Sequence, residues 1–104
     1  MLAELEIIPL GTQSPSISSL LAEVAKLIDK SGLDYRVGPM GTVVEGEWDR
    51  IMTLAKQCHQ AMFASAARVM TTIRIDDRKD QPGGGRITQK VQSLEAKVGK
   101  PLRK

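Results

Sequence analysis

Aromatic residues are scarce in this chain of 104 residues: Tyr35, Trp48 and Phe63 make up 3% of it. Surfaces that recognise single-stranded RNA stack bases on exposed aromatic side chains. The segments 2–10 and 42–46, which we predict below to be central strands, contain no aromatic residue. The scarcity therefore argues against base stacking, and it requires a core of aliphatic residues, alanine and methionine.

Cysteine and histidine are each present once, as Cys58 and His59. A single cysteine excludes an internal disulfide and does not by itself make a zinc site, so we predict no metal site and a reducing compartment. His59 falls on the apolar stripe of a predicted helix. We expect a buried, neutral histidine with one hydrogen-bond partner, the alternative being a general base.

Long apolar runs are also missing. No run approaches the roughly 20 residues needed to span a bilayer, and the first residues lack the features of a signal peptide. We therefore expect a cytoplasmic protein without a membrane partner.

The charge is unevenly distributed. Residues 1–77 hold seven basic and ten acidic residues, whereas residues 78–104 hold eight basic and two acidic ones. A basic end of this kind can contact phosphate groups, which makes a nucleic-acid-binding module the alternative function. We favour the simpler interpretation, a solvated helix followed by a charged end.

Hydrophobic periodicity predicts seven elements. Alternating residues indicate strands at 2–10, 34–38, 42–46 and 68–76, and helical spacing indicates helices at about 15–31 and 47–65. A short third helix follows the glycine-rich segment 83–85; its apolar positions are Ile87, Val91, Leu94 and Val98.

This order is that of the split βαβ, ferredoxin-like α+β fold. It predicts a four-stranded antiparallel sheet with the first and third strands at its centre, two helices on one face and an additional C-terminal helix. We expect one domain over residues 1–98 and a basic tail over 99–104.

The second face of this sheet mixes charged and apolar residues. It would carry Glu4, Glu6 and Ile8 from the first strand, with Val43 and Met70 from its neighbours. Opposite charges in such positions can pair across strands, and two such faces can pack about a two-fold axis. We predict a homodimer in which the two sheets pack together, or a homotetramer built from such dimers. The alternative is an exposed face with scattered apolar residues.

Four short segments carry a resemblance to a known family: residues 9–12 with the serines that follow, 38–42, 45–47 and 75–78. Over Glu4 to Val98, the chain resembles the YkoF-like thiamine-binding family. The resemblance implies a ferredoxin-like fold, dimers or tetramers, no catalytic activity, and thiamine or a hydroxymethylpyrimidine-type ligand in some members.

The side chains of these segments suit such a ligand. Hydroxyls and a carboxylate can hydrogen-bond an aminopyrimidine, a thioether offers a polarizable surface to a ring, and glycine permits close backbone approach. The predicted ligand-binding residues are Thr12, Ser14, Met40, Gly41, Thr42, Glu45 and Asp76. Each also has a structural interpretation: turn geometry for Gly41, a helix cap for Ser14, an ion pair for Glu45, and a strand-ending salt bridge or turn cap for Asp76.

The sequence therefore predicts a non-enzymatic binding protein, a carrier or sensor, with no bound cofactor other than such a ligand. A small isomerase that uses an acid or His59 is a further alternative, but no nucleophile–base set or carboxylate pair occurs at a suggestive spacing.

Overall fold

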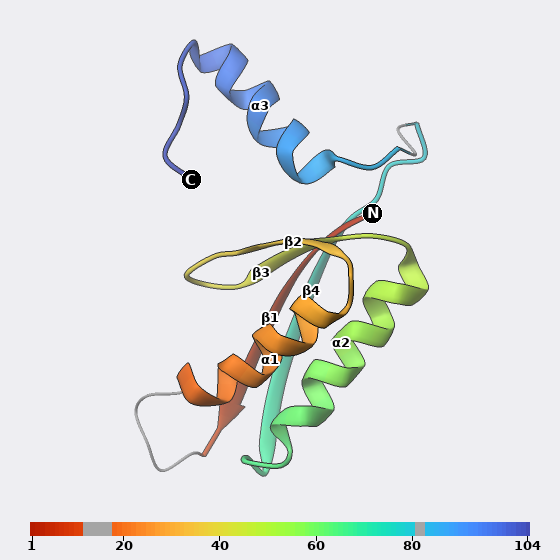
Figure 1. The fold of residues 1–104 in the computed structure, drawn as a ribbon, viewed down its shortest axis with the longest axis vertical. Coiled ribbons are helices and arrows are strands. Elements are labelled where there is room, and N and C mark those ends of the chain that lie inside the picture. Colours follow the sequence, from red (N-terminus) through yellow and green to blue (C-terminus); the bar gives the residue numbers. More distant parts are fainter. Residues whose placement is uncertain (12–17, 81–82) are drawn as a thin grey trace.

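The computed structural model describes residues 1–11, 18–80 and 83–104 (Figure 1). Within these ranges four strands and three helices follow one another: β1 (Leu2–Leu10), α1 (Ser18–Lys30), β2 (Asp34–Val37), β3 (Thr42–Glu45), α2 (Trp48–Met62), β4 (Arg68–Asp76) and α3 (Arg86–Val98). The predicted ferredoxin-like α+β fold with an additional C-terminal helix is confirmed.

The predicted helix 47–65 ends earlier than expected. The N–H groups of Phe63, Ala64 and Ser65 bond to carbonyls three residues back, at 3.1, 3.3 and 3.1 Å. Such bonds tighten the last turn and end the α-helical pattern. The start of the predicted helix 15–31 falls partly on residues 12–17, outside the described residues.

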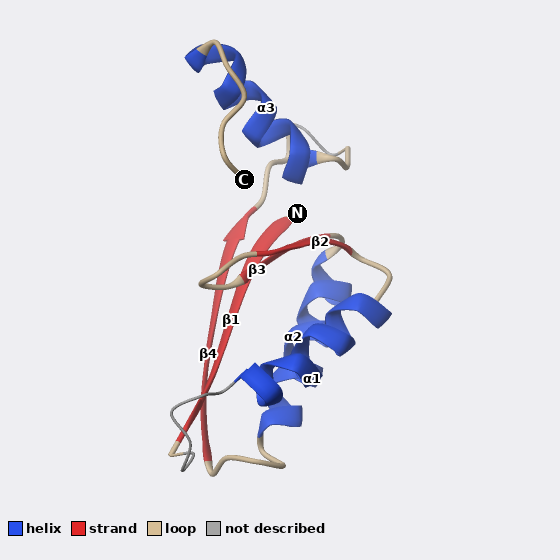
Figure 2. Ribbon diagram, turned by 60° about the vertical axis from the view of Figure 1, so that its left-hand side comes forward, coloured by secondary structure: helices blue, strands red, loops and turns tan. Residues whose placement is uncertain are grey.

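The sheet has the order β2-β3-β1-β4, with every neighbouring pair antiparallel. The two inner strands are β1 and β3, as predicted. β1 pairs with β4 along its whole length, from Leu2 opposite Asp76 to Leu10 opposite Arg68. It pairs with β3 only from Leu2 to Leu5. Figure 2 shows β1 and β4 continuing well beyond the short β2–β3 hairpin.

The core lies between the sheet and the two helices α1 and α2. Alternate residues of β1 point into it, and the fully buried side chains are aliphatic or sulfur-containing: Ile28, Val44, Ile51, Leu54, Cys58 and Met62. Burying each of the larger aliphatic side chains contributes about 1.5–3 kcal/mol. The expectation of an aliphatic core is confirmed.

His59 has the predicted hydrogen-bond partner. Its Nδ1 lies 2.6 Å from Oγ1 of Thr71 on β4, and its ring packs edge-on against Phe63. The side chain is half-buried and not fully buried as predicted. His59 therefore links α2 to the sheet.

The third helix lies at one end of the opposite face of the sheet. Glu45, Leu2 and Asp76 form one row across β3, β1 and β4, and this row contacts the start of α3 through Arg86. Leu2 is only 7% exposed although its side chain points away from α1 and α2. Figure 1 shows the rest of α3 extending away from the sheet.

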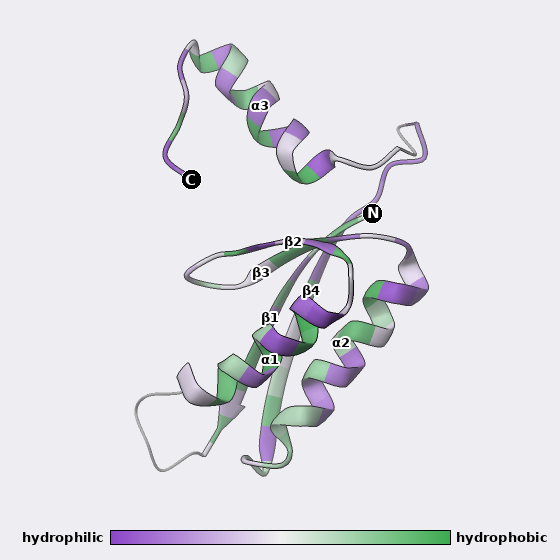
Figure 3. Cartoon of the chain, viewed as in Figure 1, coloured by the Kyte–Doolittle hydropathy of each residue, from purple (hydrophilic) through white to green (hydrophobic). Residues whose placement is uncertain are grey.

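The remainder of this second face is open and mixed in character. Arg74 and Glu4 face each other across β4 and β1 and form an ion pair at 2.8 Å, so the predicted cross-strand pairing is confirmed there. Met70 is 50% exposed, and Ile8 and Val43 are half-buried. Figure 3 shows hydrophobic and hydrophilic residues interspersed along these strands and along α3.

Candidate ligand-binding site

A cavity of about 540 Å3 lies where β3 stops covering β1. Its walls are the part of β1 beyond Leu5, the inner side of α1 and the turn between β2 and β3. The lining residues are Leu5, Glu6, Ile7, Ile8, Ser18, Leu21, Ala22, Val24, Ala25, Ile28 and Val37–Thr42. Cavities of a few hundred Å3 with apolar walls and a few polar groups are typical of small-molecule sites.

The hairpin turn that borders the cavity is built from residues that break strands. Gly38 N–H donates to the Gly41 carbonyl at 2.8 Å, so Pro39 and Met40 form a two-residue loop. Proline presets its own φ for such a turn. The turn therefore ends the hairpin beside Leu5, half-way along β1.

Three of the predicted site residues meet at this cavity: Met40, Gly41 and Thr42. Met40 is 80% exposed on the turn, and Thr42 is half-buried at the start of β3. A Cβ on Gly41 would lie 3.1 Å from the Leu5 carbonyl oxygen. Gly41 is thus the position at which the turn can approach β1 closely.

Two other predicted residues lie elsewhere. The buried Glu45 carboxylate accepts hydrogen bonds from the N–H groups of Arg86 at 3.0 Å and Ile87 at 3.3 Å. It thereby caps the N-terminus of α3, where the helix leaves N–H groups without partners and favours negative charge. In this structure the Glu45 carboxylate is occupied by α3 and does not line the cavity.

Asp76 is also engaged with α3. Its carboxylate accepts from Lys90 Nζ at 2.5 Å and from Arg86 Nη2 at 3.0 Å. The hydrogen bond from Lys90, together with the positive charges of Arg86 and Lys90, holds the pKa of Asp76 below its ordinary value. The strand-ending salt bridge that we considered for this residue is present.

The remaining two predicted residues, Thr12 and Ser14, lie outside the described residues. Their contact with a ligand stays a prediction.

Glu6 also lines the cavity, although it is not among the residues predicted from the sequence to bind a ligand. Its side chain is half-buried. Within the described ranges no ion pair or hydrogen bond is found for its carboxylate. Alternation along β1 predicted that Glu6 lies on the open face of the sheet. The register that sets Thr42, the first residue of β3, opposite Leu5 and leaves Glu6 uncovered could not be derived from the local sequence.

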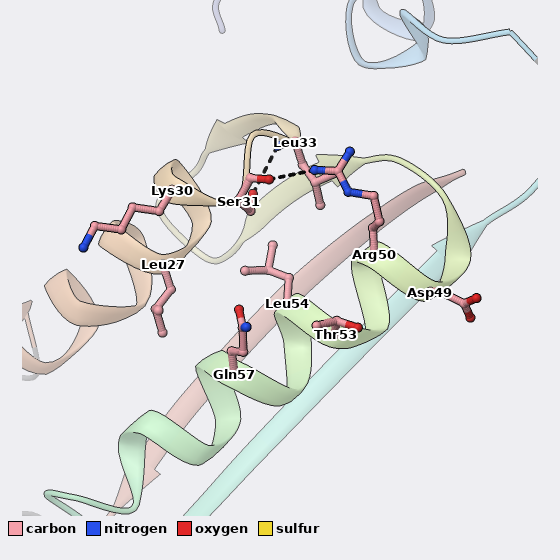
Figure 4. A pocket seen from close by; sticks show the side chains of 9 residues that line it. All are labelled: Leu27, Lys30, Ser31, Leu33, Asp49, Arg50, Thr53, Leu54 and Gln57. Carbon is pink, nitrogen blue, oxygen red and sulfur yellow. Dashed lines mark hydrogen bonds between the residues drawn. The ribbon is translucent and has the colours of Figure 1, made fainter.

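Two further hollows differ in character. One of about 510 Å3 lies between the end of α1 and the start of α2 (Figure 4). Figure 4 shows Leu27 and Leu54 pointing into it and Lys30 and Asp49 pointing away. Arg50 donates to the Ser31 carbonyl at 2.7 Å and so satisfies the C-terminus of α1. Of the predicted site residues that the structure describes, none lines this groove.

The other hollow, of about 500 Å3, lies between α3 and the covered end of the sheet. Its charged residues pair with one another: Arg74 with Glu4, and Arg86 and Lys90 with Asp76. The cavity beside β1 instead has apolar walls and the Glu6 carboxylate, for which the described residues provide no ion-pair partner. It is therefore the better candidate for a ligand site.

The described ranges contain no group of three or more histidine, cysteine or acidic residues that could hold a metal ion. Among the same residues, no helix is long and apolar enough to cross a membrane. Cys58 is buried, and burial raises the pKa of its thiol to about 11. A thiol in this state is a poor nucleophile.

The sequence and the fold match known proteins over most of the chain. A family model described as thiamine-binding protein matches residues 3–95. A UPF0045 protein from Methanothermobacter thermautotrophicus is 42% identical over 98 residues, covering 92% of this chain and 97% of its own. The UPF0045 protein YqgV from Bacillus subtilis is 38% identical over 102 residues, covering 93% and 89%.

Two solved structures are similar. The hypothetical protein MJ1052 from Methanocaldococcus jannaschii matches with a TM-score of 0.81 and 32% identity, over 89% of this chain and 93% of its own. A Thermotoga maritima protein named for thiamine biosynthesis or salvage has a TM-score of 0.76 and 24% identity, over 89% and 96%, and so supports the fold alone. The chain therefore belongs to the thiamine-binding protein family, several members of which carry the name UPF0045.

Proposed function

We propose that this protein binds thiamine or a related aminopyrimidine in the cavity bordered by β1, α1 and the β2–β3 turn, as a carrier or sensor and not as an enzyme. The observation that carries the proposal is the position of Met40, Gly41 and Thr42 on one cavity of about 540 Å3. The match to the family model described as thiamine-binding protein supports a thiamine-type ligand.

The chemistry of the cavity suits a flat, partly cationic ligand. Apolar side chains from α1, among them Leu21, Val24 and Ile28, form one wall. The Met40 thioether offers a polarizable surface at the mouth. Glu6 supplies a carboxylate that can attract the thiazolium charge or accept from an exocyclic amine, a charge-assisted hydrogen bond of the stronger kind.

Catalysis is not part of the proposal. His59 is hydrogen-bonded to Thr71 and lies outside the cavity lining, and the Cys58 thiol is buried. The single, buried cysteine also fits a role in a reducing compartment such as the cytoplasm.

Isothermal titration calorimetry of the pure protein with thiamine tests the proposal. We expect saturable heat with one site per chain, and a similar result with 4-amino-2-methylpyrimidine if the pyrimidine half dominates. Absence of heat with both compounds at millimolar concentration would refute it.

Two variants test whether the heat of thiamine binding arises from this cavity. Glu6→Gln removes the free charge and Thr42→Val removes a hydroxyl while keeping the shape, so each should weaken thiamine binding. We expect about a tenfold loss for Glu6→Gln, because a hydrogen bond to a charged group is worth about 1.5–3 kcal/mol and one to a neutral amide about 0.5–1.5 kcal/mol. Glu23→Gln is the matched control, since Glu23 is exposed on α1 and pairs with Lys26.

We also propose that the protein forms a homodimer or homotetramer through the uncovered part of the second sheet face. Ile8, Val43 and Met70 place apolar surface there, next to the Glu4–Arg74 pair. Because α3 covers the row at Leu2, the contact would use the rows that follow it, from Glu4 onward.

Nucleic-acid binding through the basic C-terminal region is the weaker candidate. Several basic residues of that region already have acidic partners: Arg86 and Lys90 pair with Asp76, and Lys104 pairs with Glu95 at 2.8 Å. Paired charges contribute less to phosphate binding. Salt-dependent RNA retention that is lost on deleting residues 99–104 would favour this candidate.

A further inference from the structure

The main chain of β1 has an unpaired stretch of edge inside the cavity. β3 pairs with β1 only as far as Leu5, opposite Thr42, whereas β1 continues to Leu10. Extending the same register would place Met40 opposite Ile7. Met40 instead sits in the hairpin loop that Gly38 and Gly41 close.

The direction of each main-chain group follows from the ladder. Gly46 N–H donates to the Met1 carbonyl at 3.0 Å, so Met1 directs its main-chain groups toward β3. Along an antiparallel strand these directions alternate between the two sides. Ala3, Leu5 and Ile7 therefore direct their N–H and C=O toward the β3 side, and Glu6 and Ile8 direct theirs toward β4. The position of the Leu5 oxygen beside Gly41 agrees with this assignment.

Ile7 is consequently the residue of β1 whose N–H and C=O both face the edge that β3 does not cover. Leu5 has Thr42 opposite it, and Pro9 carries no N–H. None of the hydrogen bonds of the described loops involves Ile7, and Ile7 lines the cavity. A strand edge normally pairs these groups, and leaving them without partners away from water is costly.

We propose that the Ile7 N–H and C=O recognise the ligand through hydrogen bonds. They present a donor and an acceptor side by side, which selects a planar heterocycle with a ring nitrogen next to an exocyclic amine. This inference rests on the proposed function and identifies the group that would give it specificity. The ring nitrogen would accept from Ile7 N–H, and the amine would donate to Ile7 C=O. The Ile7 side chain is 6% exposed in the core, so its main chain is held rigidly for this purpose.

A matched pair of probes tests the selectivity. 4-Amino-2-methylpyrimidine offers the ring nitrogen and the amine, and 2,4-dimethylpyrimidine has nearly the same shape but lacks the donor. We expect binding of the dimethyl compound to be weaker by about tenfold, the value of one hydrogen bond at the upper end of its ordinary range. Equal affinity of the two compounds would overturn the inference.

Amide hydrogen exchange followed by NMR tests the atoms directly. In the ligand-free protein, Ile7 N–H should exchange faster than the amides of Glu6 and Ile8, which face β4. The aminopyrimidine should slow exchange at Ile7 and shift its amide resonance, with little change at Glu6 and Ile8. These two neighbouring amides serve as internal controls.

The outcomes separate the two proposals. Saturable binding of the aminopyrimidine with an unchanged Ile7 amide would refute the role of Ile7 and leave the binding function standing. No binding of either probe or of thiamine would refute both. Protection of Ile7 in the ligand-free protein that grows with protein concentration would also overturn the inference, because it would show that this edge pairs with a second copy.

Discussion

Glu45 and Arg86 are 41 residues apart in the sequence, and the Glu45 carboxylate accepts a hydrogen bond from the Arg86 main-chain N–H at 3.0 Å. Arg86 in turn donates from its side chain to Asp76 at 3.0 Å. The end of β3, the end of β4 and the start of α3 are thereby joined at one point. This junction positions the C-terminal helix, and it can be tested separately from ligand binding.

Replacing Glu45 should loosen α3. Glu45→Gln removes the charge and one acceptor from the helix N-terminus, and loss of a cap costs about 0.5–2 kcal/mol. We expect faster amide exchange throughout α3 and unchanged exchange in α2. Glu47→Gln is the control, because Glu47 is exposed and makes no capping hydrogen bond at the start of α2. Weaker thiamine binding with an intact α3 would instead favour a ligand contact for Glu45.

The attachment of α3 to the sheet should weaken at acid pH. Because the pKa of Asp76 is lowered in the folded protein, mainly by the hydrogen bond from Lys90 and also by Arg86, its contribution to stability is present above the ordinary value of 3.8. It is lost as the pH falls below that value, through the lowered pKa. Amide exchange of α3 between pH 5 and pH 2 should show this loss. Asp76→Asn should remove it, and Asp77→Asn should not.

Gly41 should not tolerate a side chain. A Cβ there would lie 3.1 Å from the Leu5 carbonyl oxygen, so the turn would have to move away from β1. We expect Gly41→Ala to lower the free energy of unfolding by about 1–3 kcal/mol, the usual cost of overpacking, and to weaken thiamine binding. Gly84→Ala is the control, since nothing lies within 4 Å of its added Cβ. Equal stability of the two variants in urea unfolding would contradict the close contact.

Charge on the open face should prevent self-association. Met70 is 50% exposed there, and burying an added carboxylate in an interface is costly unless it is paired. Sedimentation velocity should show an oligomer for the natural sequence and a monomer for Met70→Glu. Ala64→Glu, in the exposed turn that follows α2, should leave the oligomer intact. A natural chain that is monomeric at all concentrations would refute the proposed assembly.

The Cys58 thiol should react slowly in the folded protein. Its pKa is raised from 9.0 to about 11 by burial, which lowers the thiolate fraction about a hundredfold near neutral pH. The raised value also means that stability falls as the pH rises from about 9 through 11, because the unfolded thiol ionises first. A colorimetric thiol reagent should label the chain rapidly in denaturant and slowly in buffer. Rapid labelling in buffer would contradict burial.

Much of the fold was predictable because its signals are local. The alternation in 2–10 and 68–76 assigned Ala3, Leu5 and Ile7 to the core face, and the register confirms that assignment. The order of strands and helices then leaves few topologies, since connections are short and crossovers right-handed. The predicted end of α2 was less accurate. The final turn tightens through hydrogen bonds to carbonyls three residues back, and no sequence pattern marks these bonds.

The candidate site was predictable only in part. Pro39 and Gly41, between the predicted strands 34–38 and 42–46, indicated a turn, and the turn does border the cavity. Glu45 offered a carboxylate of the correct type for a ligand, yet a helix 41 residues later takes up that carboxylate. Local sequence carries no information about so distant a partner.

The sequence by itself determined the secondary structure, the two faces of the sheet and the aliphatic character of the core, because each depends on the spacing of neighbouring side chains. Only the tertiary structure decided that β3 begins beside Leu5, that the main chain of Ile7 faces a cavity, and that Glu45 and Asp76 hold α3. These relationships join residues far apart in the chain, and they arise when strands of unequal length are packed against one another.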